Sequence, residues 1–240
     1  MCTVTYWGSP GKSVFTFSRD ELAARATTDY LHEKETGFKK VVYAKDARGG
    51  SWFTADSEGN LAVLFNGAFE KHLKKEQYKK SRGLILLDLI CSSNPQHVLS
   101  ETDLEQIEPF SILLYSNNNL YRASWNGSKL IENRLNPLGS YIFSSATLYS
   151  SDAIQLREAW FSEYLDRHKE EMNEELLYRF HRSYKSGDKT NGLVICRPGG
   201  CQTLSISQAV LYPFYTVLQH TDLLTGTSSS RILDRQQYAV

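Results

Sequence analysis

The chain has 240 residues, of which 41% are hydrophobic and 22% charged, a composition typical of globular proteins. Its 27 basic and 27 acidic residues balance to a formal charge of zero, and nucleic-acid-binding proteins usually carry a basic excess, so we expect no nucleic-acid partner. No stretch matches a secretory signal or approaches the roughly 20 apolar residues of a membrane span. We therefore expect a cytoplasmic protein without stable membrane insertion.

Two hairpins are predicted in the first third of the chain. Residues 3–7 and 13–17 are rich in β-branched and aromatic residues, and a Gly-Ser-Pro-Gly turn separates them. Residues 51–55 and 61–65 form the second pair, and its return strand ends on Asn66. A polar side chain is therefore expected to emerge at a sheet edge there.

The rest of the chain predicts helices at 82–92 and 151–182, where apolar residues recur at roughly helical spacing. The length of the second segment suggests two helices, broken near 170–173. This order of strands, helix, strands, helices and strands predicts one α+β domain over residues 1–240, whose last ten or so residues are loosely held. Further predicted strands lie at 110–116, 119–125, 130–134 and 140–147, followed by a hairpin at about 192–197 and 201–217.

Cys2 is the first candidate for chemistry. Removal of Met1 would leave Cys2 with a free α-amine of pKa about 8, which could take the proton from its own thiol. Arg19 and Asp20 end the strand that pairs with the Cys2 strand, so the hairpin returns them to the chain start. A buried Arg–Asp pair there would orient the amine and lower the pKa of the thiol. The alternative is a surface ion pair that contributes little.

Five motifs follow one another through the first ninety residues: Met-Cys at 1–2, Ser-Arg-Asp-Glu at 18–21, Gly-Gly-Ser-Trp at 49–52, Gly-Asn-Leu-Ala-Val-Leu-Phe-Asn at 59–66 and Ser-Arg-Gly at 81–83. Their order and spacing resemble the NRDE family, also called the transport and Golgi organisation protein 2 family. The name-giving motif of that family is Asn-Arg-Asp-Glu, and this chain has Ser18 in its first place. The resemblance continues more weakly to the last hairpin.

The resemblance implies a four-layer αββα sandwich of the N-terminal-nucleophile (Ntn) hydrolase type, with mostly antiparallel sheets. It also implies a relation to cysteine amidases such as bile-salt and penicillin V hydrolases, in which the N-terminal cysteine attacks an amide carbonyl. Carried onto this chain, Cys2 is the nucleophile, Arg19 and Asp20 orient it, and Asn66 donates to the oxyanion. Such a donor is worth about 3–4 kcal/mol.

Two positions depart from the family pattern. Ser145 stands where family members often have asparagine, and Gln202 stands where an arginine is expected. These changes remove one oxyanion donor and one cation, which would weaken amide hydrolysis. We assign Trp52, Arg82, Ser145 and Gln202 to ligand binding in the same pocket, and we expect no metal site.

A second function stays open, because the resemblance includes members linked to haem trafficking and to lipid or acyl-CoA homeostasis. In that interpretation the pocket carries a small ligand with an anionic group and requires no cofactor, haem being one ligand to be transported. His72 and His97 are candidate axial ligands, as are the cysteine thiolates, although the six histidines show no metal-ligand spacing. Basic residues that would hold anionic groups, unless they form only a solvated surface, are Lys71, Lys74, Lys75, Lys79, Lys80 and Arg82.

Overall fold

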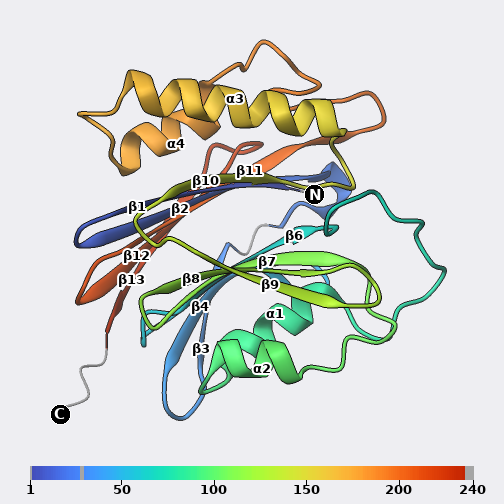
Figure 1. Ribbon diagram of the computed structural model, residues 1–240, viewed down its shortest axis with the longest axis vertical. Coiled ribbons are helices and arrows are strands. Elements are labelled where there is room, and N and C mark those ends of the chain that lie inside the picture. Colours follow the sequence, from blue (N-terminus) through green and yellow to red (C-terminus); the bar gives the residue numbers. More distant parts are fainter. Residues whose placement is uncertain (1, 28–29, 236–240) are drawn as a thin grey trace.

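The computed structural model describes residues 2–27 and 30–235, and it confirms the predicted αββα sandwich. Two antiparallel sheets lie face to face, with one pair of helices above them and another pair below (Figure 1). Within the described residues, no helix is both long enough and apolar enough to cross a membrane.

The first sheet has the strand order β10-β1-β2-β11-β12-β13, so β1 lies next to the edge strand β10. All five pairings in this sheet are antiparallel. Its strands are β1 (Cys2–Ser9), β2 (Lys12–Leu22), β10 (Ser140–Ser144), β11 (Cys201–Leu211), β12 (Tyr215–Asp222) and β13 (Ser228–Asp234).

The second sheet is formed by seven strands in simple chain order, so each strand pairs with the one that follows it. Its strands are β3 (Leu31–Glu35), β4 (Lys40–Lys45), β5 (Ser51–Asp56), β6 (Leu61–Asn66), β7 (Phe110–Ser116), β8 (Asn119–Trp125) and β9 (Leu130–Leu135).

Helices cover the outer face of each sheet (Figure 1). The second sheet packs against α1 (Arg82–Cys91) and α2 (Pro95–Glu101), and the first against α3 (Ser151–Arg167) and α4 (Glu174–Ser183). A short 3₁₀ turn, η1 (Ala23–Arg25), follows β2.

The main core lies between the two sheets, and strand alternation decides which residues enter it. Tyr6, Phe15 and Phe17 point from the β1/β2 hairpin into this core, where they meet Phe53 and Phe65 from the second sheet. Successive side chains of a strand point to opposite faces. The residues between them, which are mostly Thr and Ser, therefore lie buried beneath α3 and α4.

The predicted C-terminal hairpin is wrong in its extent. Strand β11 ends at Leu211, Pro213 follows in the turn, and the chain returns as β12, because proline cannot donate to a ladder. Of the strand expected at 192–197, only an isolated bridge between Cys196 and Gln202 remains. Residues expected to be loosely held pair in β13 as far as Asp234, and residues 236–240 lie outside the described residues.

Candidate active site

Cys2 begins β1 and lines a cavity of about 440 Å³ at one end of the sandwich. It pairs with Arg19 across the antiparallel β1/β2 ladder, so both side chains emerge on the same face of the sheet. Its side chain is only 4% exposed, and burial raises the pKa of the thiol, with Asp20 adding to the rise and Arg19 opposing it. The site therefore holds a protonated thiol at neutral pH unless a base is supplied.

The cavity wall is strongly charged, and cations predominate. Carboxylates in the wall are fewer than guanidinium and ammonium groups, so the cavity suits a ligand that carries negative charge. The basic lining residues are Arg19, Arg25, Arg48, Lys74, Lys75, Lys80 and Arg82, and the acidic ones are Glu21, Asp46, Glu76 and Glu108.

Arg19 is held by Asp46, not by Asp20. Its Nη2 lies 2.6 Å from the Asp46 carboxylate, which also accepts from Arg25 at 2.8 Å. The guanidinium of Arg19 stacks 3.9 Å from the ring centre of Trp52, which fixes its plane in the cavity wall. The predicted Arg19–Asp20 pair is therefore wrong, because neighbouring residues of a strand face opposite sides of the sheet.

Asp20 lies behind the cysteine, on the helix-covered face of the first sheet. Tyr149 donates its hydroxyl hydrogen bond to Asp20 at 2.7 Å, and Thr203 donates another at 2.6 Å. Burial raises the pKa of Asp20, while Arg157 and these two donors oppose the rise. The structure thus places one predicted orienting residue in the cavity wall and the other beneath it.

Arg157 is a buried residue that sequence reasoning missed. It projects from α3, stacks 3.6 Å from the ring centre of Tyr149 and donates to the hydroxyls of Thr3 and Ser144. Its Nε also donates to the Asn191 carbonyl at 3.0 Å. These contacts anchor the start of β1, beside Cys2, to the helix layer.

A sequence signal for Arg157 does exist. The side chains that α3 buries are Ala153, Arg157, Phe161 and Tyr164, which recur at helical spacing. A single charge within such an apolar stripe indicates a buried polar function, because unpaired charges are rarely tolerated in a core. The apolar residue Leu156 obscures this signal in the sequence. Counting it in the apolar stripe shifts the predicted buried face of the helix, although Leu156 is 42% exposed.

Asn66 and Ser145 connect the two sheets at the cavity. The Ser145 backbone N–H donates to the Cys2 carbonyl at 2.9 Å, and its hydroxyl donates to the Asn66 carbonyl at 2.8 Å. Ser145 thereby ties the start of β1 to the end of β6. Asn66 lines the cavity, and no hydrogen bond to its side-chain amide occurs among the described residues. That amide is available to a ligand.

The four predicted ligand-binding residues separate into two pairs. Trp52 and Arg82 line the cavity, whereas Ser145 is fully buried behind it and Gln202 lies beside Glu21 without reaching the wall. Ser145 and Gln202 therefore depart from their predicted role. The Ser145 side chain is used in the link between the sheets, and the Gln202 side chain lies 4.0 Å from the Cys196 sulfur.

Trp52 and Arg82 differ in how much binding capacity they retain. The indole N–H of Trp52 is buried and has no hydrogen-bond partner among residues 2–27 and 30–235, an arrangement that is costly unless a ligand or water accepts from it. Arg82 is already engaged, since its guanidinium lies 2.9 Å from Glu108 and donates to the Pro109 carbonyl at 3.0 Å. Burial lowers the pKa of Arg82, and Glu108 opposes that shift.

The two glycine-containing motifs at 49–52 and 81–83 meet at one side of this cavity. Gly50 and Gly83 approach each other closely, and a Cβ on Gly83 would lie 2.9 Å from the backbone of Ser51. Only glycine allows the start of α1 to rest directly on the start of β5 at this point. The close approach places Trp52 and Arg82, which follow and precede these glycines, in the same wall.

The histidines proposed as haem ligands do not lie in the cavity wall. His72 Nε2 lies 3.4 Å from Glu108, and His97 is an exposed residue whose backbone N–H bonds to Asn94 at the start of α2. The described residues contain no group of three or more His, Cys, Asp or Glu side chains able to hold a metal ion. The residues present therefore do not fit axial coordination of a haem by histidine.

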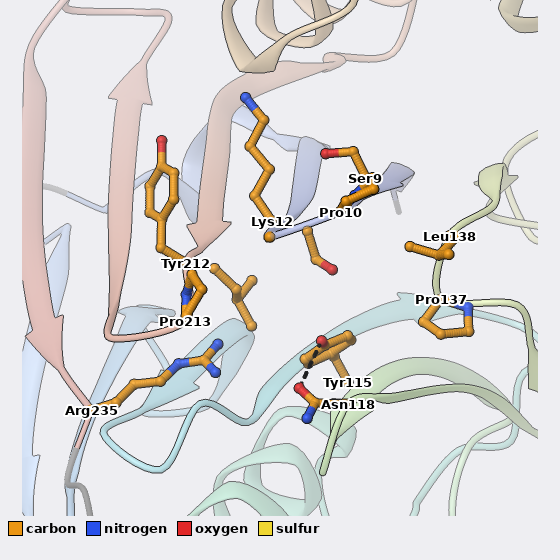
Figure 2. Close-up of a pocket in the computed structure, with 13 residues that line it drawn as sticks. Ser9, Pro10, Lys12, Tyr115, Asn118, Pro137, Leu138, Tyr212, Pro213 and Arg235 are labelled. Atoms are coloured by element: carbon orange, nitrogen blue, oxygen red, sulfur yellow. Dashed lines mark hydrogen bonds between the residues drawn. The ribbon is translucent and has the colours of Figure 1, made fainter.

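A second cavity, of about 430 Å³, lies at the opposite end of β1, beside Ser9 (Figure 2). Its wall comes from turns and strand ends, and Figure 2 shows the Tyr115 hydroxyl bonded to Asn118 at 3.3 Å. Lys12 and Arg235 supply its cations, and its described lining residues include no cysteine or carboxylate side chain. The Cys2 cavity is therefore the better candidate for chemistry.

Comparison with known families gives a match over most of the chain. The model of the family described as "Transport and Golgi organisation 2" matches residues 1–194. No curated protein matches the chain.

Solved structures share the fold at low sequence identity. Penicillin V acylase from Agrobacterium tumefaciens has a TM-score of 0.59 and 8% identity, covering 96% of this chain and 85% of the acylase chain. An arginine-to-leucine variant of conjugated bile acid hydrolase from Clostridium perfringens has a TM-score of 0.55 and 10% identity, covering 96% and 92%. The likeness at such identities concerns the fold.

Proposed function

Because this chain belongs to the transport and Golgi organisation 2 family and shares a fold with an acylase and a bile acid hydrolase, we propose that it hydrolyses a C–N amide bond with Cys2. The observation that carries the proposal is the position of Cys2 in the wall of a cation-rich cavity. Arg19 lies beside the thiol and Asp20 beneath it.

The proposed reaction begins once Met1 has been removed. The α-amine of Cys2 takes the thiol proton, and the thiolate sulfur forms a bond to the amide carbonyl carbon while the π electrons move to oxygen. When the intermediate collapses, the C–N bond breaks and the departing nitrogen receives the proton from the α-ammonium. Water then attacks the thioester with the amine as base, which releases a carboxylic acid and restores the thiol.

Each neighbour has a role that follows from its position. The Asn66 amide, which is unengaged among the described residues, would donate to the developing oxyanion. Arg19, rigid against Trp52 and Asp46, would hold an anionic group of the substrate. Asp20 would favour the protonated α-amine electrostatically. Since burial raises the pKa of the Cys2 thiol, the amine is the base that the reaction requires.

A second candidate is a non-catalytic carrier of a small anionic ligand in the same cavity, within the cytoplasm. The raised pKa of the thiol and the absence of a second amide donor at Ser145 favour it. The unpartnered Trp52 N–H and the surrounding cations would serve a carrier as well as an enzyme. Haem fits this cavity less well than other anions, because neither His72 nor His97 lines it.

The test separates the two candidates through Cys2. The intact mass of the protein from its own host should lack one methionine, and the protein should hydrolyse members of a panel of N-acyl anilides that carry a carboxylate. Cys2→Ala should abolish hydrolysis and keep ligand binding, whereas Cys196→Ala, at an exposed cysteine outside the cavity, should leave activity unchanged. Retention of Met1 would exclude the α-amine of Cys2 as the base, and hydrolysis that survives Cys2→Ala would exclude Cys2 as the nucleophile.

A further inference from the structure

Residues 67–81, which we call the rim loop, connect β6 to α1 without a helix or strand. Figure 1 shows this segment running out at the side of the molecule, near the chain start, before it returns to α1. Leu73, in the middle of the loop, is 95% exposed, more than any other large hydrophobic residue that the structure describes. Phe69 in the same loop is 49% exposed.

Lysines surround this exposed leucine. Lys79 and Lys80 are paired with Asp103 and Asp88 respectively. The other three lysines of the loop have no carboxylate within ion-pair distance in the part of the chain that the structure describes, and all three are exposed. These three are Lys71, Lys74 and Lys75.

The combination matters more than either feature. A single exposed leucine is ordinary on a protein surface, and so is a solvated lysine. An apolar side chain flanked within two positions by three unpaired cations is the arrangement that an interfacial segment presents to a bilayer. There the lysines meet anionic headgroups, while the leucine enters the boundary between headgroups and acyl chains.

The loop also borders the cavity that contains Cys2. Lys74 and Lys75 line that cavity and directly follow Leu73 in the sequence. A surface that covers Leu73 would therefore lie against the cavity opening. The exposed leucine therefore lies close to the opening of the candidate active site.

We propose that the rim loop docks this protein onto an anionic lipid surface, with Leu73 inserted at the headgroup boundary and Lys71, Lys74 and Lys75 on lipid phosphates. Docking would present the cavity to amphiphilic ligands held in the membrane. The contact is peripheral and requires no spanning segment. It depends on the loop alone and not on the chemistry of Cys2.

The experiment is flotation of the full chain with vesicles of phosphatidylcholine, with and without about one third phosphatidylserine. The wild-type protein should bind only the anionic vesicles. Replacing all three unpaired lysines with glutamine should weaken binding about a hundredfold, roughly fivefold for each charge. Leu73→Gln should weaken it about tenfold, because the transfer of one leucine side chain is lost.

Matched controls carry the same substitutions on other surfaces. Leu138→Gln replaces a leucine that is 60% exposed, and Lys169→Gln replaces an exposed lysine beyond α3. Both should bind vesicles as the wild type does, and so should Cys2→Ala, which separates docking from hydrolysis. Failure of the wild type to bind anionic vesicles would overturn the proposal. So would vesicle binding that needs the lysines but ignores Leu73→Gln, since it would indicate attraction to any polyanion and no insertion at the headgroup boundary.

Discussion

His181 makes the stability of this protein sensitive to acid. It lies on α4 beneath the first sheet, where Nε2 is 2.8 Å from the Thr5 hydroxyl and Nδ1 is 2.7 Å from the Ser18 hydroxyl. Two hydroxyls could accept from an imidazolium, so hydrogen bonding alone does not exclude the charged form. The charged form is disfavoured by burial and by the nearby cation of Arg157, which together lower the pKa of His181 to about 3.

The sign of the effect follows from the direction of this shift. A base whose pKa is lowered by folding binds more protons in the unfolded chain, so the folded state loses stability as the pH falls below the unfolded pKa of 6.5. The loss is about 1.4 kcal/mol per pH unit until the folded pKa is reached. Between pH 6.5 and about pH 5, His181 alone should therefore cost about 2 kcal/mol.

The assay is urea unfolding of the wild type and of His181→Gln across this pH range. The amide of glutamine can still bond to both hydroxyls but does not titrate, so the variant should lose less stability by about 1.4 kcal/mol per unit. Burial lowers the pKa of His220 to about 4 and raises the pKa of Asp20. Both shifts are present in both proteins, so their effects on stability cancel in the difference. His97→Gln, at the surface, should follow the wild type. Parallel loss of stability in wild type and His181→Gln would refute the reasoning.

Three further predictions concern buried and catalytic groups. Lys39 lies 2.6 Å from Asp56 with both side chains fully buried, so Lys39→Met should lower the free energy of unfolding by about 3–5 kcal/mol in urea titrations, and adding Asp56→Asn should recover part of it. If Asn66 donates to the oxyanion, Asn66→Ala should reduce kcat about a hundredfold to a thousandfold while KM changes little; an unchanged kcat would remove it from the mechanism. Thr203→Val deletes a hydrogen-bond donor to Asp20 and should therefore raise the pKa of that carboxyl. The acid limb of the kcat–pH profile should then move to higher pH. Thr203→Ser keeps the hydroxyl and should leave the profile unchanged.

Local patterns were sufficient to place Cys2 beside Arg19. The Gly-Ser-Pro-Gly turn fixes the register of the β1/β2 hairpin, and Gly11 adopts a φ of 80° that the turn requires. Once the register is fixed, the partner of each residue can be counted along the two strands. Helices α1, α3 and α4 and the central strands were predicted for the same reason, because periodicity is a property of one segment, whereas the short α2 was missed.

The partners of the site residues could not be predicted in this way. Arg19 pairs with Asp46, which belongs to the loop between β4 and β5, and Asp20 depends on Tyr149 and Thr203, far along the chain. The pattern within one segment does not indicate which residues far along the chain will contact it. Strands β3 and β4 were also missed, because the alternation in Leu31–Glu35 is mostly polar and its burial depends on the sheet that it joins.

Ser145 stands where the family resemblance leads us to expect an asparagine, and in the structure it links the two sheets. Ser145 has no amide to offer an oxyanion, yet its backbone N–H and hydroxyl bond to the carbonyls of Cys2 and Asn66. Those two residues begin and end strands of different sheets, so their spacing depends on how the sheets stack. Ser145→Ala removes the bond to the Asn66 carbonyl together with the hydroxyl contact to Thr147, and it keeps the backbone bond to Cys2. Ser145→Asn adds an amide in a fully buried space. If the geometry between Cys2 and Asn66 governs hydrolysis, alanine should lower kcat with little change in KM or in the midpoint of thermal unfolding.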